Sequence, residues 1–227
     1  MAGVEWAVSQ RVHIIGLSLG SDGPGDGTDA LSETCDMAAR AGIVVCTAAG
    51  NSGPRRSSVG APGVARNVIT VGASSDDDTV LDFSGRGPTQ DGRSKPDVCF
   101  PGDNIISCRA RGASVGRVID DYYTEMSGTS MATPQAVGAV ALILQRRPEL
   151  KPAQVKEILK QTAVSMGADI NAQGMGRADV LRAIQSNMSP AVSLDPSPLQ
   201  PGTAPVQSPA ATHDGCSRVA ASMFKRK

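Results

Sequence analysis

The 227-residue sequence carries 22 basic and 22 acidic side chains, and this zero formal net charge gives no reason to expect nucleic acid or an anionic membrane surface as a partner. No stretch approaches the ~20 consecutive apolar residues of a membrane span, and the N-terminus lacks the basic and apolar regions of a signal peptide. Five cysteines, an odd number, define no clear disulfide framework. Cys35, Cys46 and Cys99 lie among apolar residues and are expected to pack as small hydrophobic side chains, with a Cys99–Cys108 bridge as the alternative.

The first half of the chain alternates helical patterns with short apolar runs. Continuous apolar runs are typical of strands in a sheet that is covered on both faces. His13 lies on the first such run, several residues before the turn at Ser18, so we interpret it as a strand histidine and not as a catalytic base. The expected helices cover residues 3–10 and 29–41, and the expected strands cover residues 12–17, 43–48 and 68–73.

The second half is expected to be mainly helical and then to change in composition. Pro152 opens a helix over residues 153–162, since proline is tolerated at a first helical position, and a last helix follows over residues 178–185. Beyond Ser189, six prolines stand among Ser, Ala and Gln, a composition typical of linkers and disordered tails. The sequence therefore predicts a domain over residues 1–188 and a tail over residues 189–227.

A polar, glycine-bearing turn, residues 126–134, runs directly into an apolar stretch, residues 135–144. A helix that is apolar on nearly every side is expected to be buried. Ser130 would lie in its first turn, where free N–H groups and the helix dipole favour an anionic centre. A hydroxyl placed there can attack a carbonyl while its own N–H holds the oxyanion. Pro134 leaves the carbonyl of Ser130 without its helical partner. The alternative is that Thr129 or Ser130 only caps the helix.

The heptapeptide Gly-Thr-Ser-Met-Ala-Thr-Pro, residues 128–134, resembles the active-site serine motif of the subtilisin-like serine proteases. The resemblance extends from about residue 3 to about residue 185, in the family's order. It implies an α/β protein with the three-layer αβα subtilisin-like fold and a mostly parallel sheet, incomplete at the N-terminus. It also implies a serine endopeptidase that forms an acyl-enzyme at Ser130.

Other segments resemble parts of the family's substrate groove. Asn51 follows an expected strand, at the end where open α/β sheets bind ligands, and resembles the family's oxyanion asparagine. Taken alone, it would be a turn asparagine. The segment 18–20 resembles the groove strand with which an extended substrate pairs, and Gly60 would leave room for a substrate side chain. The substrate-binding residues implied by the resemblance are Ser18, Leu19, Gly20, Ala48, Ala49, Gly50, Gly60 and Thr129.

The resemblance assigns no residue of this chain to the family's catalytic aspartate and histidine. Neither His13 nor His213 matches the motif, so the chain looks like the C-terminal two-thirds of the catalytic domain and is expected to be inactive alone. The alternative is a non-catalytic fragment that binds extended peptides or complements a separate N-terminal piece. An ester-cleaving α/β-hydrolase is disfavoured because Ser130 is not in a Gly-x-Ser-x-Gly turn.

The sequence predicts no metal ligands. Loop 21–28 carries Asp22 and Asp26, but their spacing fits no calcium motif and a flexible surface loop is favoured. Calcium is implied by the family resemblance alone, as is a secreted or extracytoplasmic location. The expected partner is a peptide or protein substrate.

Overall fold

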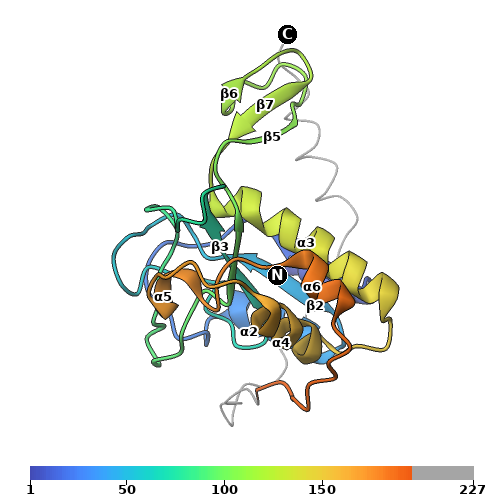
Figure 1. Ribbon diagram of the computed structural model, residues 1–227. Coiled ribbons are helices and arrows are strands. Elements are labelled where there is room, and N and C mark those ends of the chain that lie inside the picture. Colours follow the sequence, from blue (N-terminus) through green and yellow to red (C-terminus); the bar gives the residue numbers. More distant parts are fainter. Residues whose placement is uncertain (196–227) are drawn as a thin grey trace. The chain divides into compact units, whose positions relative to one another are not determined.

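The computed structural model describes residues 1–195 (Figure 1). Helices alternate with the first two strands, two further strands complete the parallel sheet without a helix between them, and four helices follow an antiparallel insertion. The helices are α1 (Ala2–Ser9), α2 (Ala30–Arg40), α3 (Thr129–Arg146), α4 (Pro152–Thr162), α5 (Ile170–Gln173) and α6 (Val180–Gln185). The strands are β1 (Ile14–Leu17), β2 (Val44–Ala48), β3 (Ile69–Ser74), β4 (Val98–Pro101), β5 (Ile105–Cys108), β6 (Arg117–Val118) and β7 (Tyr123–Met126).

Strands β1 to β4 form a parallel sheet in the order β1-β2-β3-β4. Successive side chains of a strand point to opposite faces, so β2 sends Val44 and Cys46 to one side and Val45 to the other. The first core cluster also contains residues of α3, α4 and α6, and the second contains residues of α1 and α2. Helices therefore cover both faces, and the expected α/β fold with a parallel sheet is confirmed.

Helix α3, which carries Ser130, is buried on one side only. Helix α3 buries Ala132, Ala136 and Val140 against the sheet, with exposed fractions of 0%. On its outer side Leu142 is 47% exposed and Pro134 is exposed, with no second layer over them within residues 1–195. The prediction of a helix buried all round was wrong because an apolar composition does not say which faces of a helix have a neighbour.

Strands β5, β7 and β6 form a separate antiparallel sheet, in that order, between β4 and α3. This arm, residues 103–127, projects from the parallel sheet in Figure 1 and leads directly into the serine turn. The sequence analysis did not predict it. Cys108 on β5 is exposed and Cys99 on β4 is buried, and both are free thiols, so the alternative of a bridge between them is not realised.

The first residues of the predicted tail lie against the domain. Asn67 and Asp195 exchange two hydrogen bonds, from Nδ2 to the Asp195 carbonyl at 3.2 Å and from the Asp195 N–H to Oδ1 at 2.8 Å. Arg147 donates to the Ser189 hydroxyl at 2.9 Å. The remainder of the predicted tail, residues 196–227, lies outside the described residues, and the domain boundary stays a prediction.

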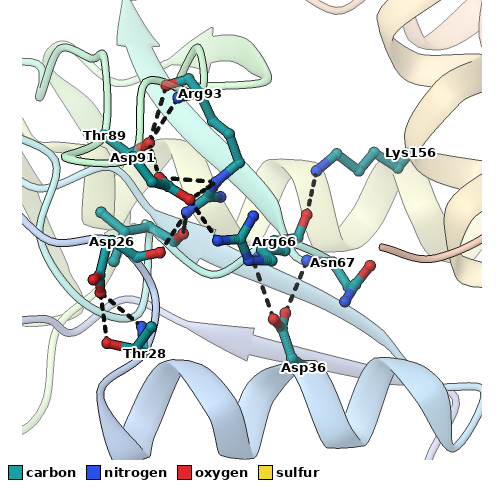
Figure 2. A network of polar contacts seen from close by, with 10 residues as sticks. Asp26, Thr28, Asp36, Arg66, Asn67, Thr89, Asp91, Arg93 and Lys156 are labelled. Carbon is teal, nitrogen blue, oxygen red and sulfur yellow. Dashed lines mark hydrogen bonds and ion pairs between the residues drawn. The ribbon is translucent and has the colours of Figure 1, made fainter. Parts of the chain in front are cut away.

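A polar network fastens the loops near the start of the sheet (Figure 2). Asp91 accepts from Arg66 at 2.5 Å and from Arg93 at 2.8 Å, and Arg93 also donates to the Asp26 carbonyl at 2.7 Å. Asp36 on α2 accepts the backbone N–H groups of Arg66 and Asn67. These contacts tie the loop after β1, helix α2 and the approach to β3 to one another.

Two lysines share one buried carboxylate beside this network. Lys95 Nζ lies 2.8 Å from Asp97 Oδ2 and 2.7 Å from Thr70 Oγ1. Lys156 Nζ, on α4, lies 3.1 Å from Asp97 Oδ1 and 2.9 Å from the Val68 carbonyl. The cluster joins α4 to the strands at their amino ends, the edge of the sheet opposite the serine.

Candidate active site

The carboxyl ends of β1 and β2 and the start of α3 meet around one cavity of about 380 Å³. Helix α3 contacts both strands, which fixes its first turn beside their ends. All ten residues that the sequence analysis assigned to catalysis or substrate binding line this cavity. The lining residues are Ser18, Leu19, Gly20, Ser21, Asp22, Ala48, Ala49, Gly50, Asn51, Ser52, Gly60, Ala61, Thr129 and Ser130.

The amide of Asn51 is held in one orientation by Thr129. Asn51 Oδ1 accepts the backbone N–H of Thr129 at 3.0 Å and its hydroxyl at 2.9 Å. Thr129 is fully buried, whereas Asn51 is exposed at the cavity, so the two hydrogen bonds are partly buried. Because both donors occupy the amide oxygen, Nδ2 is left as the group that can donate to a ligand in the cavity. Thr129 directly precedes Ser130 in the chain, so its hydrogen bonds to Asn51 bring Asn51 and Ser130 to the same site.

Ser130 is linked to Ser18 by two hydrogen bonds. The Ser130 hydroxyl donates to the Ser18 carbonyl at 3.2 Å, and the Ser18 hydroxyl donates to the Ser130 carbonyl at 2.9 Å. The second contact satisfies the carbonyl that Pro134 deprives of its helical partner, as its sequence position indicated. A peptide carbonyl cannot take a proton from serine at neutral pH, so this arrangement does not activate the Ser130 hydroxyl.

The described histidine lies away from the cavity. His13 immediately precedes β1, whereas Ser18 follows the last residue of that strand. An extended strand rises about 3.3 Å per residue, so the two ends of β1 are separated by more than the reach of a hydrogen bond. His13 is therefore not placed to act as a base for Ser130, and His213 lies outside the described residues.

The role expected for Gly60 differs in the structure. A Cβ at this glycine would lie 1.8 Å from the backbone oxygen of Ser21, so the opposite wall of the cavity fills the space expected for a substrate side chain. The two walls are joined by a hydrogen bond from the Ser21 N–H to the Ala61 carbonyl at 2.8 Å. Gly60 thus permits close approach of two backbone segments, and the room for a ligand lies elsewhere along the cavity.

Four lining residues were missed by the sequence analysis, namely Ser21, Asp22, Ser52 and Ala61. Ser52 directly follows Asn51, and its hydroxyl donates to Asp22 Oδ1 at 2.7 Å. The only available signal was adjacency, because each of these residues stands next to a segment assigned to the groove. Nothing in the loop's composition showed that Asp22 would turn toward Ser52.

Residues 1–195 bring no three His, Cys, Asp or Glu side chains together in a group that could hold a metal ion. The acidic side chains of loop 21–28, whose spacing fits no calcium motif, form hydrogen bonds with nearby residues. Asp26 accepts the N–H and hydroxyl of Thr28, and these hydrogen bonds lower the pKa of its carboxyl.

Comparison with known proteins identifies the group to which this arrangement belongs. Residues 1–176 match the subtilase family. The chain belongs to the subtilase family. It is 44% identical over 206 residues to serine protease AprX of Bacillus subtilis, covering 80% of this chain and 46% of AprX. It is 38% identical to a subtilisin of Bacillus pumilus, covering 81% of this chain and 60% of that protein. The chain thus spans about half the length of the curated subtilases it matches.

Solved subtilase structures share the fold. The prenylagaramide maturation protease PagA superposes with a TM-score of 0.68 at 27% identity, covering 81% of this chain and 65% of PagA. Fervidolysin from Fervidobacterium pennivorans, a keratinolytic enzyme related to subtilisin, gives a TM-score of 0.64 at 28% identity, covering 82% of this chain and 28% of fervidolysin. Within residues 1–195, no helix is both long enough and apolar enough to cross a bilayer.

Proposed function

We propose that this subtilase chain supplies the nucleophile, the oxyanion site and part of the substrate groove of a serine endopeptidase. Ser130 Oγ bonds to the substrate carbonyl carbon and loses its proton to a base, and the resulting oxyanion accepts hydrogen bonds from the Ser130 N–H and Asn51 Nδ2. Collapse breaks the peptide bond, the base protonates the leaving amine, and water then hydrolyses the acyl-enzyme. The observation that carries the proposal is Asn51, which Thr129 holds by its amide oxygen beside Ser130.

The base and its orienting carboxylate are proposed to come from residues other than these 227. The Ser130 hydroxyl donates to a carbonyl, and His13 lies at the far end of β1. Within residues 1–195, β1 is an edge strand of the parallel sheet and leads into the cavity at Ser18, so this edge offers a surface for such a segment. The alternative, a non-catalytic chain that binds extended peptides, requires the same groove but no base.

Complementation distinguishes the two functions. We expect the chain, co-expressed with a polypeptide that carries the Asp- and His-bearing segments of a subtilase, to hydrolyse a chromogenic peptide amide. The Ser130→Ala chain in the same complex is the control and is expected to show only background hydrolysis. A stable complex of the two polypeptides with no hydrolysis, or hydrolysis that survives Ser130→Ala, would contradict the catalytic proposal.

Asn51→Ala is expected to lower kcat in the complemented complex by about 10²–10³-fold, a magnitude measured in subtilisin itself. The amide contributes to the oxyanion that forms during attack, so KM is expected to change little. Steady-state kinetics on one chromogenic peptide gives both constants. An unchanged kcat, with the complex still Ser130-dependent, would remove Asn51 from the proposed role.

Thr129→Val is expected to lower kcat by about two- to tenfold, since one hydrogen bond to Asn51 Oδ1 is lost and such bonds contribute about 0.5–1.5 kcal/mol. Valine has nearly the shape of threonine and keeps the backbone N–H that Asn51 also accepts. The measurement is kcat in the complemented complex, with Thr129→Ser as the matched variant that retains a hydroxyl. If serine and valine were equally damaging, shape and not the hydrogen bond would be responsible.

The expected substrates are peptides and proteins in extended conformation. Ser18 to Gly20 are exposed along the cavity, where an antiparallel peptide could pair with them. The secreted or extracytoplasmic location and the calcium implied by the family resemblance stay predictions.

A further inference from the structure

Among residues 1–195, the cavity that holds Ser130 is lined by one charged side chain, that of Asp22. The other described lining residues are uncharged, so none of them places a cation beside this carboxylate. None of the ion pairs formed within residues 1–195 involves Asp22. Asp22 is therefore the one full side-chain charge that the described wall brings to the cavity.

Asp22 is positioned by contacts from both walls. The Ser52 hydroxyl donates to Asp22 Oδ1 at 2.7 Å, and Ser52 follows the oxyanion residue Asn51 directly. The neighbouring Ser21 is anchored to Ala61 by its N–H at 2.8 Å and by its hydroxyl, which accepts the Ala61 N–H at 3.2 Å. Only one carboxylate oxygen is used by Ser52, so Oδ2 is available to a ligand.

We propose that Asp22 selects substrates with lysine or arginine at the residue whose carbonyl Ser130 attacks. This inference rests on the proposed function, because it takes the cavity to be the pocket next to the reacting carbonyl. A volume of about 380 Å³ lies within the range of small-ligand sites, about 300–1,000 Å³, and admits one long side chain. The methylene groups would lie along the end of β2 at Ala48 and along Gly50, and the cation would pair with Asp22.

The test compares two product-like peptides that differ by one charge, acetyl-Ala-Ala-Ala-Lys and acetyl-Ala-Ala-Ala-norleucine. Norleucine keeps the methylene chain of lysine without the ammonium group. Binding to the full 227-residue chain is measured by NMR titration at low ionic strength. We expect the lysine peptide to bind about fivefold more tightly than the norleucine peptide, the upper end for a solvent-accessible ion pair, and the preference to shrink in high salt.

Asp22→Asn is expected to abolish this preference while leaving the norleucine peptide's affinity unchanged. Asp121→Asn is the matched control, because it makes the same change in net charge at an exposed position of the arm, outside the cavity. A lysine preference that survives Asp22→Asn, or that disappears equally in Asp121→Asn, would overturn the inference.

The failure of this inference can be told apart from failure of the catalytic proposal. Equal binding of both peptides by the unmodified chain would overturn the role of Asp22, while Ser130-dependent hydrolysis in the complemented complex would still support the proposed function. Binding of neither peptide at millimolar concentration would also overturn the inference, and the complementation result would then show whether the catalytic assignment fails with it.

Discussion

Replacing Asp97 by asparagine is expected to lower the free energy of unfolding by about 3–5 kcal/mol, the cost typical of removing one partner from a buried ion pair. Asp97 Oδ2 lies 2.8 Å from Lys95 Nζ and also accepts the Thr70 N–H at 2.8 Å. Asp97 Oδ1 lies 3.1 Å from Lys156 Nζ. Asparagine keeps the shape and one acceptor but leaves Lys156 without this counter-charge, and it does the same to Lys95 wherever Lys95 is protonated.

This cluster is expected to contribute more to the free energy of unfolding than the surface ion pairs do, because its side chains are buried. The side chains of Lys95 and Asp97 are 3% and 7% exposed. Burial tends to raise the pKa of the Asp97 carboxyl, but the charges of Lys156 and Lys95 and the hydrogen bonds it accepts hold that pKa below its usual range. Asp82→Asn is the matched control, because Asp82 is 94% exposed and 3.6 Å from Arg86, and a change below about 0.5 kcal/mol is expected.

The loss in free energy of unfolding caused by Asp97→Asn is expected to depend on pH. Burial lowers the pKa of Lys95 to about 7, against the opposing charge of Asp97. Since this folded-state pKa lies below the unfolded value, the wild-type free energy of unfolding is expected to rise with pH above about 7. Removing Asp97 lowers the pKa of Lys95 further, so Asp97→Asn should be more damaging at pH 6 than at pH 9. Urea unfolding at both pH values measures this, and an equal loss at both would contradict the account of Lys95.

The parallel sheet could be predicted because its central strands are continuous apolar runs. Residues 43–48 and 68–73 match β2 and β3 to within a residue at each end, since both strands are buried on two faces. Strand β4 has only four residues between Pro96 and Gly102, too few for a periodic signal. The arm was missed because its strands are short and none of their residues is fully buried, so no buried face imposes a hydrophobic alternation.

The part of the candidate site that lies within the recognised sequence motifs could be predicted. Ser130 and Asn51 stand in segments whose residue order carries the family resemblance, and the structure places both on one cavity. Asp22 could not be found this way, because its position depends on how a glycine-rich loop folds back onto Ser52. The neighbour of Gly60 could not be predicted either. The sequence shows a position without a side chain, but not that the backbone of Ser21 occupies the space beside it.

The isolated chain is expected to hydrolyse a chromogenic peptide no faster than its Ser130→Ala variant. A serine hydroxyl is a weak nucleophile at neutral pH unless a base takes its proton. In the structure this hydroxyl donates to the Ser18 carbonyl, and His13 stands before β1 while Ser18 follows it. In subtilisin, loss of the catalytic histidine alone lowers turnover by about 2 × 10⁶, with roughly 10³–10⁴ over water left by the oxyanion site and binding.

The measurement is the hydrolysis rate of purified residues 1–227 beside Ser130→Ala and His213→Ala. His213 is included because it is the second histidine of the sequence and lies outside the described residues. Equal background rates in all three support the requirement for an added base. A wild-type rate far above that of Ser130→Ala would contradict it, and loss of that rate in His213→Ala would identify the tail histidine as the base. A rate that survives His213→Ala would instead require another proton acceptor beside Ser130.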